Sequence, residues 1–106
     1  MGMSRLQRAQ FQDLFDVLVG DATVDPATIA ANVLVEVDVT VTGAALGDIV
    51  LAGPGVDTSN LTWSACVRAA NTVTLSFNNA SADHIDLASS TWTIVVLRPK
   101  AKITSN

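Results

Sequence analysis

The segment VLVEVDVTVT, residues 33–42, decides the fold. Its odd positions are all valine, and its even positions include Glu36, Asp38, Thr40 and Thr42. Because successive side chains of a strand point to opposite faces, this alternation predicts a strand with one face buried and the other facing outward.

Four further strands are predicted at residues 48–52, 62–68, 72–78 and 91–98, with turn signals rich in Gly, Asn and Asp between them. The last segment, TWTIVVLR, is apolar on both faces, which is typical of a central strand or of one that a partner covers. Short strands at this spacing without a helix between them indicate an antiparallel β-sandwich or a jelly-roll-like barrel.

The apolar face of each predicted strand supplies the candidate core. These positions are Val35, Val37, Val39, Ile49, Leu51, Trp63, Val67, Val73, Leu75, Phe77, Trp92, Ile94 and Val96. The opposite faces carry many hydroxyl groups and few charges, at Thr40, Thr42, Thr62, Ser64, Thr72, Thr74, Ser76, Thr91 and Thr93. Either the strand propensity of Thr or burial between subunits accounts for this composition.

The N-terminal segment predicts a different structure. Phe11, Leu14, Phe15 and Leu18 are spaced as one face of a helix, and Gly20 is placed to end it. We therefore divide the chain into an N-terminal arm, helical or extended, at residues 1–20, a sandwich at residues 21–98 and a short basic tail at residues 99–106. The apolar face of the arm either covers one end of the sheet or packs on a neighbouring subunit.

Composition favours assembly with a partner. The 106 residues are 49% hydrophobic and only 15% charged, so a lone copy has few charges to cover its surface. A net charge of -4 argues against nucleic acid as a ligand. Five of the six basic residues lie near the two ends, namely Arg5, Arg8, Arg98, Lys100 and Lys102. They are either solvated or dock on an acidic neighbour, and together with the apolar arm they form the candidate interface.

The residues offer little for catalysis. His84 is the single histidine and is expected in an exposed loop, and Cys66, the single cysteine, is expected to be a buried and inert thiol. Three or four converging ligands for a metal are lacking, so we expect no cofactor, no metal, no small-molecule substrate and no enzymatic activity. No signal core or membrane-length apolar run is present, which predicts assembly in a cytoplasm and no membrane partner.

From Val24 to Leu97 the chain resembles a family of small β-sandwich modules in phage and prophage structural proteins. The resemblance lies in VDPATIAAN, VTVTGAALGDIVLAGP, WSACVRAANTVTLSFNN and IDLASSTWTIVV, in that order. It implies a capsid decoration (cement) protein on the outside of a virion, without catalytic residues. The implied partners are its own copies, as a homotrimer, and the major capsid protein. The alternative is a head-fibre or tail-fibre module that binds a host surface.

Overall fold

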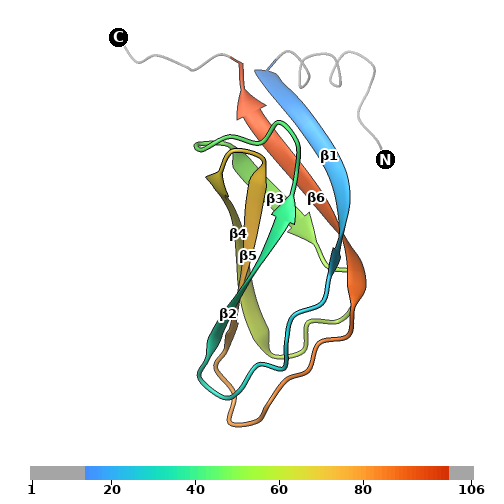
Figure 1. The fold of residues 1–106 in the computed structure, drawn as a ribbon, viewed down its shortest axis with the longest axis vertical. Helices are drawn as coiled ribbons and strands as arrows, with labels where there is room; N and C mark the ends of the chain where they lie inside the picture. Colours follow the sequence, from blue (N-terminus) through green and yellow to red (C-terminus); the bar gives the residue numbers. More distant parts are fainter. Residues whose placement is uncertain (1–13, 101–106) are drawn as a thin grey trace.

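A computed structural model describes residues 14–100, which form six β-strands (Figure 1). The strands are β1 (Phe15–Val24), β2 (Leu34–Thr40), β3 (Ile49–Gly53), β4 (Leu61–Ala69), β5 (Thr72–Asn79) and β6 (Ser90–Pro99). The five strands predicted from the alternating segments correspond to β2 through β6.

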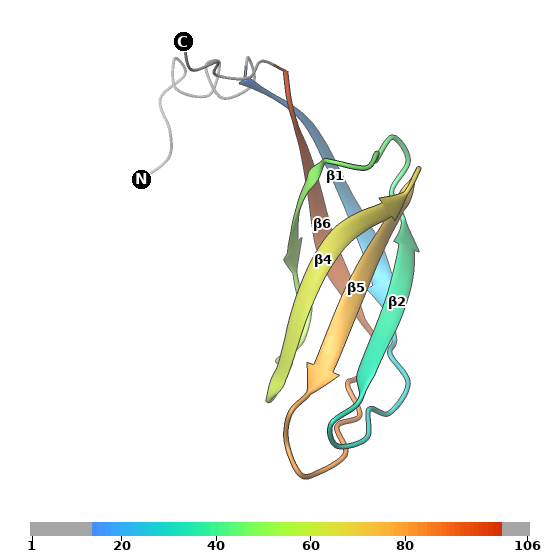
Figure 2. The same ribbon diagram turned by 90° about the vertical axis from the view of Figure 1, so that its left-hand side faces the viewer.

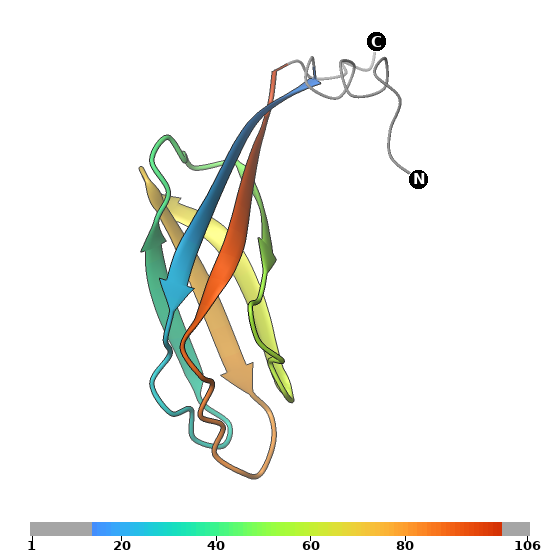
Figure 3. The same cartoon turned by 90° about the vertical axis from the view of Figure 1, so that its right-hand side faces the viewer.

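The strands form two three-stranded antiparallel sheets, in the orders β1-β6-β3 and β2-β5-β4. The sheets face each other, with β2, β5 and β4 in the foreground of Figure 2 and β1 and β6 in the foreground of Figure 3. Only the β4–β5 connection stays within one sheet among the described strands, and the other connections pass from sheet to sheet. The fold is therefore the predicted antiparallel β-sandwich.

The core lies between the sheets and confirms most of the predicted inward positions. Val39, Val67, Val73, Leu75, Phe77, Trp92, Ile94 and Val96 are buried, and Val35, Val37 and Trp63 are half-buried against them. The ring of Trp92 meets Trp63 and Phe77 edge to face, at centroid distances of 5.1 and 5.5 Å. Such pairs stabilise a core beyond the area that they bury.

Two predicted core positions in β3 are wrong. Ile49 and Leu51 lie on the outer face, and Val50 and Ala52 pack against the core instead. The cause is the register with β6, in which Val50 is opposite Val96 and Ala52 is opposite Ile94. Because directly opposed residues point to the same face, the buried side chains of β6 fix which residues of β3 point inward.

The predicted helix is also wrong from residue 15 onward, where the extended alternative for the arm is correct. Residues 15–20 belong to β1, so the boundary expected after residue 20 falls inside a strand. Leu18 packs partly against the core, whereas Leu14 is exposed and Phe15 is half-buried. Pairing of β1 along the whole of β6, from Phe15 with Pro99 to Val24 with Ser90, outweighs the helical spacing.

The prediction for the last apolar segment is confirmed, because β6 is the central strand of its sheet. Its residues Trp92, Ile94 and Val96 are buried between the sheets. Its residues Val95 and Leu97 lie on the other face of the same sheet and are half-buried. β6 is thus apolar on both sides, and only one side is covered by the second sheet.

One end of the sandwich is closed by a buried amide. Asn79 is 0% exposed, and its Nδ2 donates to the carbonyl oxygens of Ile29 at 2.9 Å and Asp83 at 2.8 Å. Its Oδ1 accepts hydrogen bonds from the backbone N–H and the hydroxyl of Ser81 at 3.0 and 2.7 Å. Both polar atoms of the Asn79 amide have hydrogen-bond partners, so the side chain is buried without an unpaired donor or acceptor. Its hydrogen bonds link the β1–β2 connection to the β5–β6 connection.

Candidate interaction surface

The outer face of the β1-β6-β3 sheet carries six aliphatic side chains in two rows. Val17, Leu97 and Ile49 lie side by side in one row, as the register of the three strands requires. The second row consists of Val19, Val95 and Leu51. We call these six residues the apolar sheet face.

The apolar sheet face is exposed to an unusual degree. Val19 is 68% exposed, Leu51 55%, Ile49 46% and Val17 39%. An outer face that meets only water usually carries charged side chains, but none of these six positions does. Covering a large aliphatic side chain contributes about 1.5–3 kcal/mol, so this face is the strongest source of binding free energy on the described surface.

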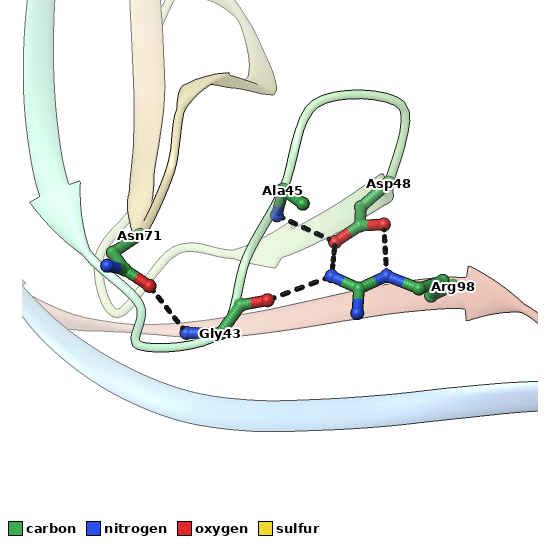
Figure 4. A network of polar contacts seen from close by, with 5 residues as sticks. All are labelled: Gly43, Ala45, Asp48, Asn71 and Arg98. Carbon is green, nitrogen blue, oxygen red and sulfur yellow. Dashed lines mark hydrogen bonds and ion pairs between the residues drawn. The ribbon is translucent and has the colours of Figure 1, made fainter.

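An ion pair at the end of β3 holds the strand in place (Figure 4). Arg98 Nε donates to Asp48 Oδ1 at 2.9 Å, and one terminal nitrogen of Arg98 donates to Asp48 Oδ2 and to the Gly43 carbonyl, both at 2.8 Å. Asp48 Oδ2 also accepts from the backbone N–H of Ala45 at 2.9 Å. The clamp joins the β2–β3 connection to β6, and so places Ile49 beside Leu97.

The electrostatics of the clamp follow from this geometry. The hydrogen bonds from Arg98 and Ala45 and the charge of Arg98 hold the pKa of Asp48 below its ordinary value, although burial of the carboxylate opposes the shift. The Asp48 side chain is 4% exposed, whereas that of Arg98 is 45% exposed. The two charged side chains bind each other, so this ion pair has a structural role and provides no free acid or base.

Glycine is required in the turn beside the clamp. Gly43 has a φ of 97° and Gly47 a φ of 94°, a region that side chains with a Cβ rarely adopt. The backbone N–H of Gly43 donates to Asn71 Oδ1 at 2.8 Å, which ties this turn to the β4–β5 hairpin. The Gly-rich turn predicted between the segments at residues 33–42 and 48–52 is confirmed.

A hollow of about 320 Å³ lies next to the clamp, between β1 and the Gly43 turn. Its charged residues are Asp16, Asp48 and Arg98, and its remaining lining is mostly aliphatic or backbone. Lys100 Nζ lies 3.6 Å from Asp16, and Arg98 is bound to Asp48. The hollow therefore contains neither a nucleophile nor an unpaired carboxylate set for catalysis.

The outer face of the β2-β5-β4 sheet, here called the polar sheet face, has a different chemistry. Glu36 forms an ion pair with Arg68 and accepts a hydrogen bond from the Ser76 hydroxyl at 3.2 Å. Thr74 Oγ1 donates to Asp38 at 2.7 Å and is only 2% exposed. These polar groups are satisfied by one another across the strands.

Cys66 lies on the polar sheet face and is exposed, so the prediction of a buried thiol is wrong. It shares its face with Thr62 and Ser64, and the alternation of β4 turns Trp63, Ala65 and Val67 inward. His84 is exposed in the β5–β6 connection, as predicted. No group of three His, Cys, Asp or Glu side chains within residues 14–100 is placed to hold a metal ion.

The residues of the expected interface are only partly brought together. Phe15, Leu18 and Arg98 lie near the paired ends of β1 and β6. Lys100 follows β6 directly, and its backbone N–H donates to the Leu14 carbonyl at 2.8 Å. Arg98 and Lys100 form ion pairs within the chain. Arg5, Arg8, Phe11 and Lys102 lie outside the described residues. The apolar sheet face was not predicted as a site, although the two-sided apolar pattern of β6 was a signal for it.

Among residues 14–100, no helix is long and apolar enough to span a membrane. No family model, curated protein or solved structure matches the chain. The apolar sheet face is therefore interpreted from its own geometry and chemistry.

Proposed function

We propose that this chain is a structural protein of a bacteriophage virion, a capsid decoration protein that binds to the exterior of the shell and stabilises it. In this role it acts through contacts with further copies of itself and with the major capsid protein. It transforms no substrate and needs no cofactor.

The observation that carries the proposal is the uncovered apolar sheet face. A sheet with six aliphatic side chains on its outer side is suited to a permanent contact, because permanent interfaces resemble a protein core cut in half. Among the described residues, no group of three His, Cys, Asp or Glu side chains is placed to hold a metal ion, so the proposed role draws on surface contact alone. The resemblance of residues 24–97 to phage structural modules supports the choice of a virion as the setting.

The proposed mechanism is the addition of interface area. A decoration protein that joins neighbouring capsomers raises the free energy needed to separate them, as any ligand that binds only the assembled state does. A rigid module favours this mechanism, because a flexible protein must be ordered when it binds, and this ordering reduces the net free energy of binding. The Asp48–Arg98 clamp and the buried Asn79 amide supply such rigidity at the two ends of the sandwich.

Cryo-electron microscopy of the native particle tests the proposal. We expect copies of the chain on an icosahedral lattice over the outer shell. A few copies at one vertex or along the tail would instead support a fibre module. Absence of the chain from the particle would refute both structural roles.

A second measurement tests the stabilising effect itself. Particles stripped of the chain are expected to lose DNA at a lower temperature than native particles, and adding the full chain back should restore the native value. The matched control is an added protein of the same size that does not bind. If add-back fills the lattice but leaves the release temperature unchanged, the stabilising mechanism is wrong.

A further inference from the structure

We propose that residues 1–13 pack on the apolar sheet face of their own chain in the free protein, with an arginine of this segment against Asp21. The contact concerns the chain before it meets any partner, so the inference goes beyond the proposed function and does not depend on it. In that role the shell takes the place of residues 1–13 on the face.

The apolar sheet face is bordered by a carboxylate. Asp21 lies opposite Thr93 of β6, and the register with β3 continues this row to Gly53, directly beyond the two aliphatic rows. Asp21 is exposed, and within residues 14–100 it takes part in none of the ion pairs. Because a charge that is covered needs a partner of opposite sign, the occupant that fits this face combines apolar side chains with a cation.

The cations of the described residues are already paired. Arg68 binds Glu36 on the polar sheet face. Arg98 binds Asp48, and Lys100 lies near Asp16. A cation of this chain that pairs with Asp21 therefore comes from outside residues 14–100, where Arg5, Arg8 and Lys102 are located.

Residues 1–13 combine the two kinds of group that the face requires. Their four large apolar side chains and two arginines are Met1, Met3, Leu6, Phe11, Arg5 and Arg8. The six residues that follow the described part, AKITSN, contain one large apolar side chain, Ile103, and one cation, Lys102. The N-terminal segment is therefore the better match to two aliphatic rows that end at a carboxylate.

Charge favours this segment over a second copy of the whole chain. Residues 1–13 carry two arginines and one aspartate, whereas residues 14–100 carry nine carboxylates and three basic side chains. The segment and the sandwich therefore have opposite net charge and attract each other. Two whole copies, each with a net charge of -4, repel each other instead.

The segment starts from the correct end of the face and is long enough to cross it. The described chain begins at Leu14, and β1 runs from there past Val17 to Asp21. At a strand rise of about 3.3 Å per residue, Asp21 is roughly 13 Å from Val17 along β1. Thirteen residues span about 43 Å when extended and about 20 Å as a helix, so either conformation reaches Asp21 after a reversal of direction before β1. A tethered segment also binds at a high effective concentration.

Paramagnetic broadening in the full chain tests the contact directly. A nitroxide is attached at Gln10→Cys in a Cys66→Ser background, because the exposed Cys66 would otherwise take the label. The methyl NMR signals of Val19 and Leu51 should lose most of their intensity relative to the reduced label. Leu34 is the matched control, because it is 59% exposed on the polar sheet face, and its signals should persist. Full intensity at Val19 and Leu51 would overturn the inference.

A mixed sample separates a contact within one chain from a contact between chains. Isotope-labelled chains without the nitroxide are mixed with unlabelled chains that carry it. The Val19 and Leu51 signals should then keep their intensity, because the segment of each chain covers its own sheet. Broadening in the mixed sample would show that the segment binds another copy, which also contradicts the proposal.

Charge reversal tests the pairing with Asp21. Arg5→Glu with Arg8→Glu should restore much of the Val19 and Leu51 intensity, because two carboxylates then approach Asp21. Adding Asp21→Arg should bring the broadening back, whereas adding Asp86→Arg, in the β5–β6 connection, should not. Equal recovery with both arginines would refute the pairing with Asp21. Failure of the contact would leave the proposed function intact, because the face would then be open to the shell at all times, and the cryo-electron microscopy of the particle tests that role separately.

Discussion

The two outer faces of the sandwich belong to sheets of the same size and strand pairing, yet they differ completely in chemistry. One presents six aliphatic side chains bordered by the charge of Asp21, and the other presents carboxylates, hydroxyls and a guanidinium that bind one another, beside the exposed Leu34. The inner faces of both sheets are alike, because both must fill one core. The comparison teaches that the core determines the fold, while the outer positions are free to differ and so carry the information about function.

The largest expected effect tests whether the two sheets depend equally on the core. Trp92 is on β6 and Phe77 on β5, the central strands of the two sheets, and both side chains are 0% exposed. Replacing either residue by alanine should lower the free energy of unfolding by about 3–5 kcal/mol, because of lost burial and a residual cavity. Chemical denaturation monitored by tryptophan fluorescence for Phe77→Ala, and by circular dichroism for both, measures the loss. An unchanged midpoint in either variant would show that its sheet does not depend on this core.

The next effect concerns the close approach of the 54–60 connection to β6. A Cβ on Gly55 would overlap the carbonyl oxygen of Thr91, whereas a Cβ on Gly53 would meet nothing within 4 Å. Gly55→Ala should cost about 1–3 kcal/mol, since backbone must shift to relieve the overlap. Gly53→Ala is the matched control and should change the midpoint of thermal unfolding much less. Equal effects of the two changes would contradict the close approach.

The two ion pairs sharpen the comparison further. Asp48 is almost fully buried and binds Arg98 through both oxygens, whereas Glu36 on the polar sheet face is 37% exposed at its side chain. Asp48→Ala should therefore lower the unfolding temperature clearly more than Glu36→Ala, because exposed pairs contribute little. The comparison fails if the two substitutions shift the midpoint equally.

The pH dependence of stability follows from the same carboxylate. The pKa of Asp48 is lowered in the folded state, so its stabilising effect is fully present above the ordinary pKa and is lost as the pH falls through the lowered value. The native chain should lose stability below about pH 4 in thermal unfolding scans. Asp48→Asn should lose less over that range, and an identical acid profile in the variant would show that Asp48 does not contribute.

The smallest effect is expected on the polar sheet face. Ser64 is exposed on β4, and Ser64→Ala should change the free energy of unfolding by no more than about 0.5 kcal/mol. Chemical denaturation of the isolated chain measures this value. A loss of several kcal/mol would mean that this face contributes to the fold as strongly as the core does.

Much of the fold could be predicted from local patterns, and β1 shows where this approach fails. The residues LFDVLV at 14–19 are apolar on both faces of a strand, so they lack the alternation that identifies β2. Their spacing also satisfies a helical face. The segment forms a strand and not a helix because β1 pairs with β6, which is far away in the sequence. This pairing cannot be recognised from the local sequence of residues 14–19.

The short strand β3 shows a related limit. In IVLAG either alternate set can point inward, and the larger side chains Ile49 and Leu51 suggest themselves as core. The register with β6 decides otherwise and fits the small Ala52 opposite Ile94. Because the alternation of β3 was assigned one residue out of phase, Ile49 and Leu51 were predicted as core residues. The sequence analysis therefore did not identify the apolar sheet face.

The pairing of the first described strand with the last has a consequence for the order of folding. β6 is the central strand of its sheet, and its partners β1 and β3 have no contact with each other in the sheet until β6 lies between them. The β4–β5 hairpin can form early because its strands are joined by Ala70 and Asn71 alone, whereas the β1-β6-β3 sheet must wait for the closure of a loop that spans most of the chain. During synthesis on the ribosome, the residues of the apolar sheet face therefore come together only after β6 has emerged. Nascent chains that are close to one another on the same messenger then cannot associate through this face before β6 has been synthesised.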